Sequence, residues 1–281
     1  MFASKKSNFP LGILIFSLFV SVMPQAIAGN PPTSIPGKSP NPKCSTSSNS
    51  SPTAKVSVVK NLNKDCVQLQ TDLVGLWNFE GSNLGADTSG FYNLTPQSDP
   101  SQLVLPLKTS QGKYGSGLHL QQGAYLGLFG TVQGLPAGNA SYTYSAWINP
   151  DGQGSPVGGI LAYGRSGNNL SNSLRLNGWN GIWHYWYNND FGFNVANSLV
   201  GNWSHIASTY DSITGERKLY LNGNLMNTDT PNNAPDFISE DLLIGKTTAD
   251  STFSGTLDEV ALFRSALTQV QISQVMLGNY G

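Results

Sequence analysis

From Leu73 onward, the chain consists of short apolar runs separated by turn residues, a pattern typical of strands. Asn222-Gly223 is typical of a two-residue hairpin turn, and only residues 268–277 have a helical period. The pattern predicts an all-β fold, one large antiparallel sandwich or barrel with one short C-terminal helix. The runs that suit strands are residues 73–79, 117–120, 125–128, 142–148, 158–163, 173–176, 182–187, 203–210, 217–221, 242–244 and 257–263.

Charged residues are scarce, which excludes classes of protein that depend on strong electrostatic attraction. Only 11% of the residues are charged, and 15 basic side chains stand against 16 acidic ones. Nucleic-acid binding needs a basic surface to neutralise phosphates. We therefore expect no nucleic-acid partner.

The N-terminus has the features of a secretory signal peptide. Lys5 and Lys6 precede an apolar run at residues 11–22, and a small-residue motif ends at Ala28. A membrane anchor is the less favoured alternative, because a spanning helix needs about 20 apolar residues. We expect residues 1–28 to be removed from an exported protein (secreted, periplasmic or on the cell surface) that keeps no integral membrane segment.

Residues 29–66 differ from the rest in composition and predict a tether. They are rich in Pro, Ser and Asn and carry a net charge of +4, whereas residues 67–281 carry eight basic and 15 acidic side chains, a net charge of −7. Cys44 and Cys66 are the only cysteines, and an even pair in an exported chain predicts one disulfide. The expected organisation is a signal peptide, a tether closed by this disulfide, and one domain at residues 67–281.

Several segments, in order along the chain, resemble the signature of laminin-G-like jelly rolls in the concanavalin A-like lectin and glucanase superfamily. The resemblance covers about residues 73–278 and implies a two-sheet jelly roll. Independently of the resemblance, Trp77, Trp147 and Trp203 are large apolar residues at strand positions, and we expect them to pack between the sheets. The matching segments are LWNFE at 76–80 with DTSG at 87–90, YSAWI at 144–148, NWSHIASTYD at 202–211, LYLNG at 219–223 and GTLDEVALF at 255–263.

The superfamily includes glycosidases, but the sequence lacks the motifs that carry catalysis in such enzymes. Retaining glycosidases need two carboxyl groups close together, and the E-x-D-x-x-E motif of laminarinase-like jelly rolls is absent. A G-x-S-x-G nucleophile motif is absent as well. His205 belongs to the fold signature, and packing near Trp203 explains it unless the fold supplies a serine partner. We expect no enzyme activity.

The resemblance also nominates residues for a calcium ion. In many jelly rolls of this superfamily the first and last strands lie side by side, and their carboxylates share a structural ion. This implies a structural calcium site with Glu80 and Asp258 as ligands, joined by Asp87. The alternative is that Asp87 and Asp258 only cap turns.

An aromatic segment at residues 179–187 is the candidate for carbohydrate binding. A strand there would place one aromatic row in the core and leave the other for the flat faces of sugar rings, with polar neighbours bonding to hydroxyl groups. The alternative is that both rows pack inside the sandwich. One row is Trp183, Tyr185 and Tyr187; the other is Ile182, His184 and Trp186; the polar neighbours are Asn180, Asn188, Asn189 and Asp190.

These residues and the resemblance predict an exported, non-catalytic carbohydrate-binding or adhesion module. Its expected partner is an extracellular glycan or another surface polymer. The first alternative is a structural or adhesive envelope protein that binds another protein. A degenerate glycosidase or polysaccharide lyase is a weaker alternative, because the acid pair is absent.

Overall fold

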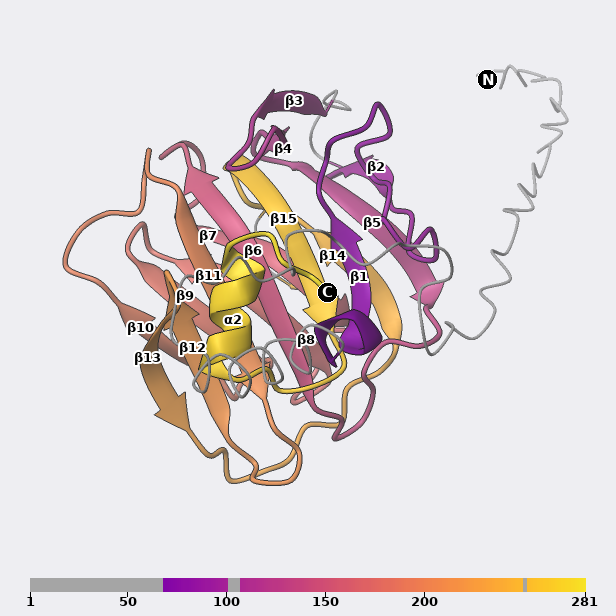
Figure 1. Cartoon of the computed structure of the whole chain (residues 1–281), viewed down its shortest axis with the longest axis vertical. Helices are drawn as coiled ribbons and strands as arrows, with labels where there is room; N and C mark the ends of the chain where they lie inside the picture. Colours follow the sequence, from indigo (N-terminus) through magenta and orange to yellow (C-terminus); the bar gives the residue numbers. More distant parts are fainter. Residues whose placement is uncertain (1–67, 101–106, 250–251) are drawn as a thin grey trace, which may run out of the picture.

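Two antiparallel β-sheets packed face to face form the body of the protein (Figure 1). The computed structural model describes residues 68–100, 107–249 and 252–281. The predicted signal peptide, the tether and the Cys44–Cys66 disulfide lie outside the described residues. The predicted all-β sandwich is confirmed.

Sheet A has eight strands in the order β13-β12-β11-β6-β15-β4-β3, with β1 also paired to β15; sheet B has the order β10-β9-β8-β7-β14-β5-β2. The strands of sheet A are β1 (Leu73–Trp77), β3 (Lys108–Gln111), β4 (Ser116–Leu120), β6 (Tyr142–Pro150), β11 (Ser204–Tyr210), β12 (Arg217–Leu221), β13 (Asn224–Asp229) and β15 (Gly255–Phe263). The strands of sheet B are β2 (Thr95–Ser98), β5 (Ala124–Thr131), β7 (Val157–Gly164), β8 (Ser171–Asn177), β9 (Gly181–Tyr185), β10 (Phe191–Asn194) and β14 (Glu240–Ile244).

Every predicted strand segment coincides with an observed strand, and the strands that were not predicted are the four at the ends of the two sheet orders. These are β2, β3, β10 and β13. Their residues are mostly exposed or half-buried, and β2, β3 and β13 show no apolar alternation, while β10 has only two alternating phenylalanines. The first and last strands, β1 and β15, pair antiparallel, as the resemblance implied.

The main core lies between the sheets and contains only one of the three tryptophans expected there. Trp77 is fully buried in it. Trp147 instead lies on the outer face of sheet A, where its Nε1 donates to the carbonyl of Met276 at 3.1 Å. Trp203 precedes β11 and is half-buried. The expectation was wrong for Trp147 because the C-terminal helix covers this outer face of sheet A.

Helix α2 (Gln269–Met276) covers the outer face of sheet A (Figure 1). Thr268 and Gln271 form a capping box at its start, so the predicted C-terminal helix is confirmed. Ile272 and Val275 pack with apolar residues of the sheet and with Leu69 in the helical turn at residues 68–72. Sheet A therefore has apolar contacts on both faces.

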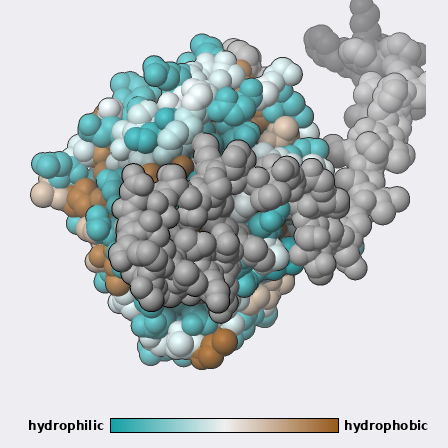
Figure 2. All heavy atoms as spheres, in the orientation of Figure 1, coloured by the Kyte–Doolittle hydropathy of each residue, from teal (hydrophilic) through white to brown (hydrophobic). Residues whose placement is uncertain are grey.

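On the side of the molecule that carries α2, the surface that is not drawn in grey is mostly hydrophilic, and its hydrophobic residues form small groups (Figure 2). Among the residues that the structure describes, none of the helices is long and apolar enough to cross a membrane.

Candidate functional site

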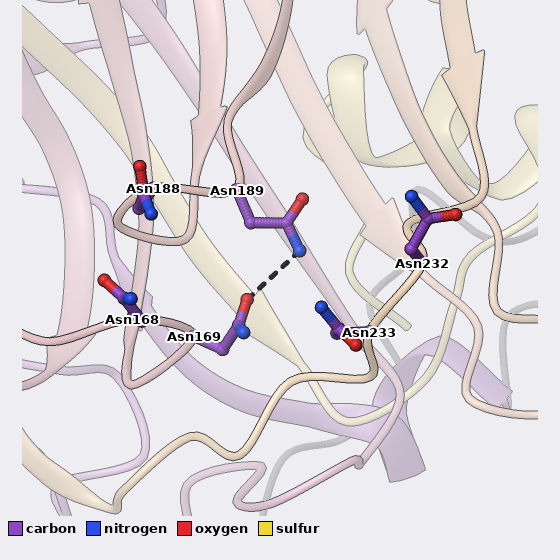
Figure 3. Close-up of a pocket in the computed structure, with 6 residues that line it drawn as sticks. All are labelled: Asn168, Asn169, Asn188, Asn189, Asn232 and Asn233. Carbon is purple, nitrogen blue, oxygen red and sulfur yellow. Dashed lines mark hydrogen bonds between the residues drawn. The ribbon is translucent and has the colours of Figure 1, made fainter.

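A polar pocket of about 290 Å³ opens at one end of the sandwich, and six asparagines line it (Figure 3). Three connections supply them: the β7–β8 loop (165–170), the β9–β10 loop (186–190) and the β13–β14 connection (230–239). We call this the asparagine pocket. Its lining residues are Asn168, Asn169, Asn188, Asn189, Asn232 and Asn233.

Asn169 joins all three connections. Its backbone N–H donates to the Trp186 carbonyl at 2.9 Å, and its own carbonyl accepts from the Asp236 N–H at 3.1 Å. Its side-chain oxygen accepts from Nδ2 of Asn189 at 3.1 Å, the bond drawn in Figure 3. These bonds hold the three pocket connections together.

Left-handed backbone conformations shape the pocket walls. Asn169, Tyr187 and Asn188 have φ values of 59°, 57° and 66°. Asparagine tolerates this region better than most residues, because its short side chain bonds locally. The turn at Tyr187 ends β9 at Tyr185, so the strand predicted through Tyr187 is shorter than expected.

Arg217, at the start of β12, is a buried residue that bonds to the pocket wall at Asn189. Its side chain is 1% exposed, and Nη1 donates to the Asn189 carbonyl at 2.8 Å while Nε donates to Asp229 at 2.9 Å. The guanidinium lies 4.2 Å from the Trp186 ring and 5.2 Å from the Phe191 ring. One buried cation therefore links an edge of sheet A to the β9–β10 loop of sheet B.

The other four asparagines leave their amide groups available. Asn168, Asn188, Asn232 and Asn233 are exposed, and their side chains make no hydrogen bond with another described residue. Asn169 and Asn189, in contrast, are half-buried and bonded to each other. The pocket thus consists of a fixed pair and four amides that face solvent.

Beside the pocket, the outer face of sheet B carries the predicted aromatic residues, which we call the aromatic cluster. The Arg175 guanidinium lies 4.4 Å from the Tyr185 ring and 5.9 Å from the Trp183 ring, and it pairs with Asp190 at 3.5 Å. The Tyr187 ring lies 5.9 Å from that of Tyr185. The predicted residues therefore come together, and the β9–β10 loop connects them to the pocket.

Exposure within the aromatic cluster is uneven. Tyr185 is only 8% exposed, whereas Trp183 and Tyr187 are half-buried and Asn188 is exposed. The Trp183 ring lies against the backbone of Gly192, where a Cβ atom would come within 2.6 Å of it. Its Nε1 is buried and has no hydrogen-bond partner among the described residues. Trp183 and Tyr187 are therefore the two partly exposed aromatic residues of the predicted row, and the Trp183 ring contacts the backbone of β10.

The opposite row of β9 belongs to the core. Ile182, His184 and Trp186 are fully buried, and Trp186 Nε1 donates to the Tyr142 hydroxyl at 2.8 Å. Burial holds the pKa of His184 well below its ordinary value, so this histidine stays neutral. The pattern left open which row lies inside; it is the row of Ile182, His184 and Trp186.

Asp87, one of the three nominated calcium ligands, organises a turn. One of its carboxylate oxygens accepts the backbone N–H groups of Leu76 at 2.8 Å and Ser89 at 3.2 Å. The other accepts from the Tyr92 N–H at 3.3 Å and from the Ser89 hydroxyl. These four bonds match the alternative in which Asp87 caps a turn.

Glu80 and Asp258 both bond to the turn between β3 and β4. A Glu80 oxygen accepts from the Ser116 N–H at 3.2 Å, and Asp258 accepts from the Tyr114 N–H at 2.9 Å. Gly115 has a φ of 60°, and a Cβ atom there would lie 2.2 Å from the Glu80 carboxylate. The described residues contain no group of three or more His, Cys, Asp or Glu side chains able to hold a metal. Calcium at Glu80 and Asp258 stays a prediction.

A calcium ion at Glu80 and Asp258 would stabilise the folded protein. We expect millimolar calcium to raise the melting temperature, because an ion that binds only the folded state adds its binding free energy to folding. Thermal melting in EDTA and in calcium, with magnesium as the control ion, measures this. Equal midpoints in EDTA and calcium would remove the calcium site.

The Asp258 carboxyl has a raised pKa, but a substrate cannot reach it. Burial raises its pKa from 3.8 to about 7, against the lowering effect of the Tyr114 N–H bond. A value near 7 suits a general acid. However, its side chain is fully buried, so it does not reach a substrate from solvent.

His205 does have a serine beside it, but the pair is buried. Its Nε2 lies 2.8 Å from the Ser145 hydroxyl, and both residues are 1% exposed. Burial lowers the His205 pKa to about 3, and no described residue bonds to its Nδ1 to orient the ring. Its ring lies 5.3 Å from Trp147, so the expected packing against a tryptophan involves Trp147 and not Trp203.

Sequence reasoning missed two parts of the site. The asparagines at 168, 169, 232 and 233 were not selected, because they come from loops far apart in a chain rich in asparagine. The Asn-Asn pairs at 168–169, 188–189 and 232–233 were the available signal. Arg217 was missed because a charged residue at a strand start is usually at the surface.

Solved structures similar to this chain include several binding domains. Domain 4 of AbnA, a GH43 extracellular arabinanase from Geobacillus stearothermophilus solved with arabinotriose, has a TM-score of 0.58 and 21% identity over 73% of this chain and 98% of that one. The ligand-binding domain of botulinum neurotoxin serotype D, solved with N-acetylneuraminic acid, has a TM-score of 0.56 and 15% identity over 76% and 52%. The binding domain of serotype G has a TM-score of 0.55 and 14% identity over 73% and 51%. The chain thus spans about half of each toxin domain.

Sequence comparison gives the family. No curated protein sequence matches the chain. The sequence model of the concanavalin A-like lectin/glucanases superfamily matches residues 123–273, just over half of the 281 residues. The match contains the β5 to β15 strands and most of α2, and the predicted resemblance is confirmed. The chain belongs to the concanavalin A-like lectin/glucanases superfamily.

Proposed function

We propose that this protein is an exported, non-catalytic carbohydrate-binding module. Its site would combine the asparagine pocket with the exposed ring surface of Trp183. The observation that carries the proposal is the pocket lining, in which four asparagine amides face solvent and bond to none of the residues that the structure describes. Sugar hydroxyl groups donate and accept hydrogen bonds at once, as an amide group does.

Two further observations support a glycan ligand. Ligand sites place a few convergent polar groups beside apolar or aromatic surface, and the β9–β10 loop joins the pocket to the aromatic cluster in this way. Related folds were solved with arabinotriose and with N-acetylneuraminic acid. Those ligands give the chemical class that we propose here.

The absence of catalysis is part of the proposal. The buried Ser145–His205 pair and the buried Asp258 carboxyl offer no reactive group to a substrate in solvent. The pocket lining contains amides alone, and an amide is neither a useful general acid nor a nucleophile at neutral pH.

Trp183→Ala tests the aromatic part of the proposed site. We expect it to weaken glycan binding about tenfold or more, a loss of about 1.4 kcal/mol, because it removes stacking surface. Binding is measured on a glycan array and then by calorimetry on the best ligand. Tyr185→Ala is less informative, since Tyr185 is almost buried.

Phe91→Ala is the matched control, because Phe91 is 40% exposed on a loop after β1. It should leave binding unchanged, and both variants should keep the wild-type melting temperature within a few degrees. Full binding by Trp183→Ala would exclude Trp183 from the site. If the wild-type protein binds no glycan, the function as a carbohydrate-binding module is wrong, and a protein partner becomes the better hypothesis.

A further inference from the structure

The asparagine pocket contains no charged side chain, which restricts the ligands that suit it. All six lining residues end in an amide, so the lining presents as many carbonyl oxygens as NH₂ groups. A carboxylate only accepts hydrogen bonds, and strong recognition of one requires charged or clustered donors. An asparagine can turn its NH₂ group toward a carboxylate, but this donor is neutral and its hydrogen bond is weaker than one from Arg or Lys.

The charges around the pocket add no attraction for an anion. The three pocket connections carry Arg165, Asp190 and Asp236, a net charge of −1. Arg175 of the adjoining aromatic cluster is buried and paired with Asp190 at 3.5 Å, so its charge is already balanced. The nearby cation Arg217 is buried and already paired with Asp229. Residues 67–281 as a whole carry a net charge of −7, which repels acidic polymers at moderate salt.

Hydroxyl groups fit the lining better than carboxylates do. Asn168, Asn188, Asn232 and Asn233 each offer one acceptor and two donors from the rim, and they lie on three different connections. Hydroxyls spread around a sugar ring present the same mixed pattern. The volume of about 290 Å³ lies near the lower end of ligand pockets, so a short part of a glycan fills it.

We infer that the asparagine pocket selects a neutral sugar unit over an acidic one, an inference that rests on the proposed function. The ligand is an uncharged pentose or hexose oligosaccharide, bound through hydroxyl-to-amide hydrogen bonds. Because no formal charge takes part, the dissociation constant changes less than about twofold between about 0.05 and 0.5 M salt.

Matched pairs of glycans test this selectivity on the full-length mature protein. Galactobiose is compared with digalacturonic acid, and lactose with sialyllactose, within an array that also holds xylose, arabinose and glucose oligosaccharides. We expect the neutral member of a recognised pair to bind at least about tenfold more tightly. Asn168→Ala and Asn233→Ala each weaken that binding by roughly 3- to 10-fold, because each removes one or two hydrogen bonds.

Asn224→Ala is the control. Asn224 is an exposed asparagine at the start of β13, whereas the pocket connection follows the other end of this strand. This variant leaves binding unchanged. Tighter binding of the acidic member, or neutral binding that neither pocket variant weakens, overturns the inference while the proposed function stands. Absence of binding to every glycan overturns both.

Discussion

Replacing Arg217 with alanine is expected to destabilise the protein by about 3–5 kcal/mol. Arg217 is a buried cation, and its removal leaves Asp229 without its charge partner and opens a space beside Trp186. For a domain of this size the melting temperature should fall by roughly 10 °C or more. Urea unfolding gives the free energy, and thermal melting gives the midpoint.

Two comparisons make the Arg217 prediction specific. Lys218 is the next residue on β12 and forms a partly exposed ion pair with Glu216 at 2.9 Å, so Lys218→Ala should cost less than about 1 kcal/mol. Arg217→Lys keeps the charge but loses the forked contacts with Asn189 and Asp229, and its effect should lie between the two. A loss with Arg217→Ala no larger than that with Lys218→Ala would show that Arg217 does not hold the two sheets together.

The second large effect expected is a pH dependence of stability that comes from Asp258. Its pKa is about 7 in the folded protein, whereas the ordinary value is 3.8. Between pH 3.8 and pH 7 the folded state therefore binds more protons than the unfolded state. Stability contributed by the protonated carboxyl is therefore present at low pH and is lost as the pH rises toward 7. The full difference amounts to about 4 kcal/mol.

Asp258→Asn isolates this contribution, because an amide does not titrate. In EDTA, the free energy of unfolding of the variant minus that of the wild type should increase by up to about 4 kcal/mol from pH 4 to pH 8. The new side-chain amide also faces the Glu259 N–H, and the loss of that hydrogen bond would cost free energy. This cost is the same at both pH values, so it cancels in the comparison. Parallel pH profiles would show that Asp258 titrates near its ordinary value. Calcium bound at Asp258 would reduce the wild-type slope, because the ion favours the charged carboxylate.

The interior of the fold was predictable from the sequence, and the sheet edges were not. Strand β6 places core residues at every second position, which is the signal that pattern reasoning detects; these residues are Tyr142, Tyr144, Ala146 and Ile148. The edge strands β2, β3 and β13 bury little apolar surface, and β10 buries Phe191 but is only four residues long. Asn222-Gly223 predicted the hairpin turn between β12 and β13. The residues of β13 itself have no apolar pattern that predicts where the strand ends.

The aromatic part of the candidate site was predictable, and the pocket was not. Trp183, Tyr185 and Asp190 stand close together in the sequence, so a single segment suggested them. The asparagine pocket depends on contacts between distant loops, such as the bonds from Asn169 to Trp186 and Asp236. The burial of Arg217 depends on Asp229 and Trp186, which no local pattern links to it.

The central claim is that a glycan binds the asparagine pocket, and the side-chain amides report on it directly. The measurement is a two-dimensional NMR titration of ¹⁵N-labelled protein with the tightest neutral oligosaccharide from the array. We predict saturable shifts of the NH₂ signals of Asn168, Asn188, Asn232 and Asn233, with the Asn224 signals unmoved. Binding that leaves those four signals in place and shifts signals elsewhere would contradict the account.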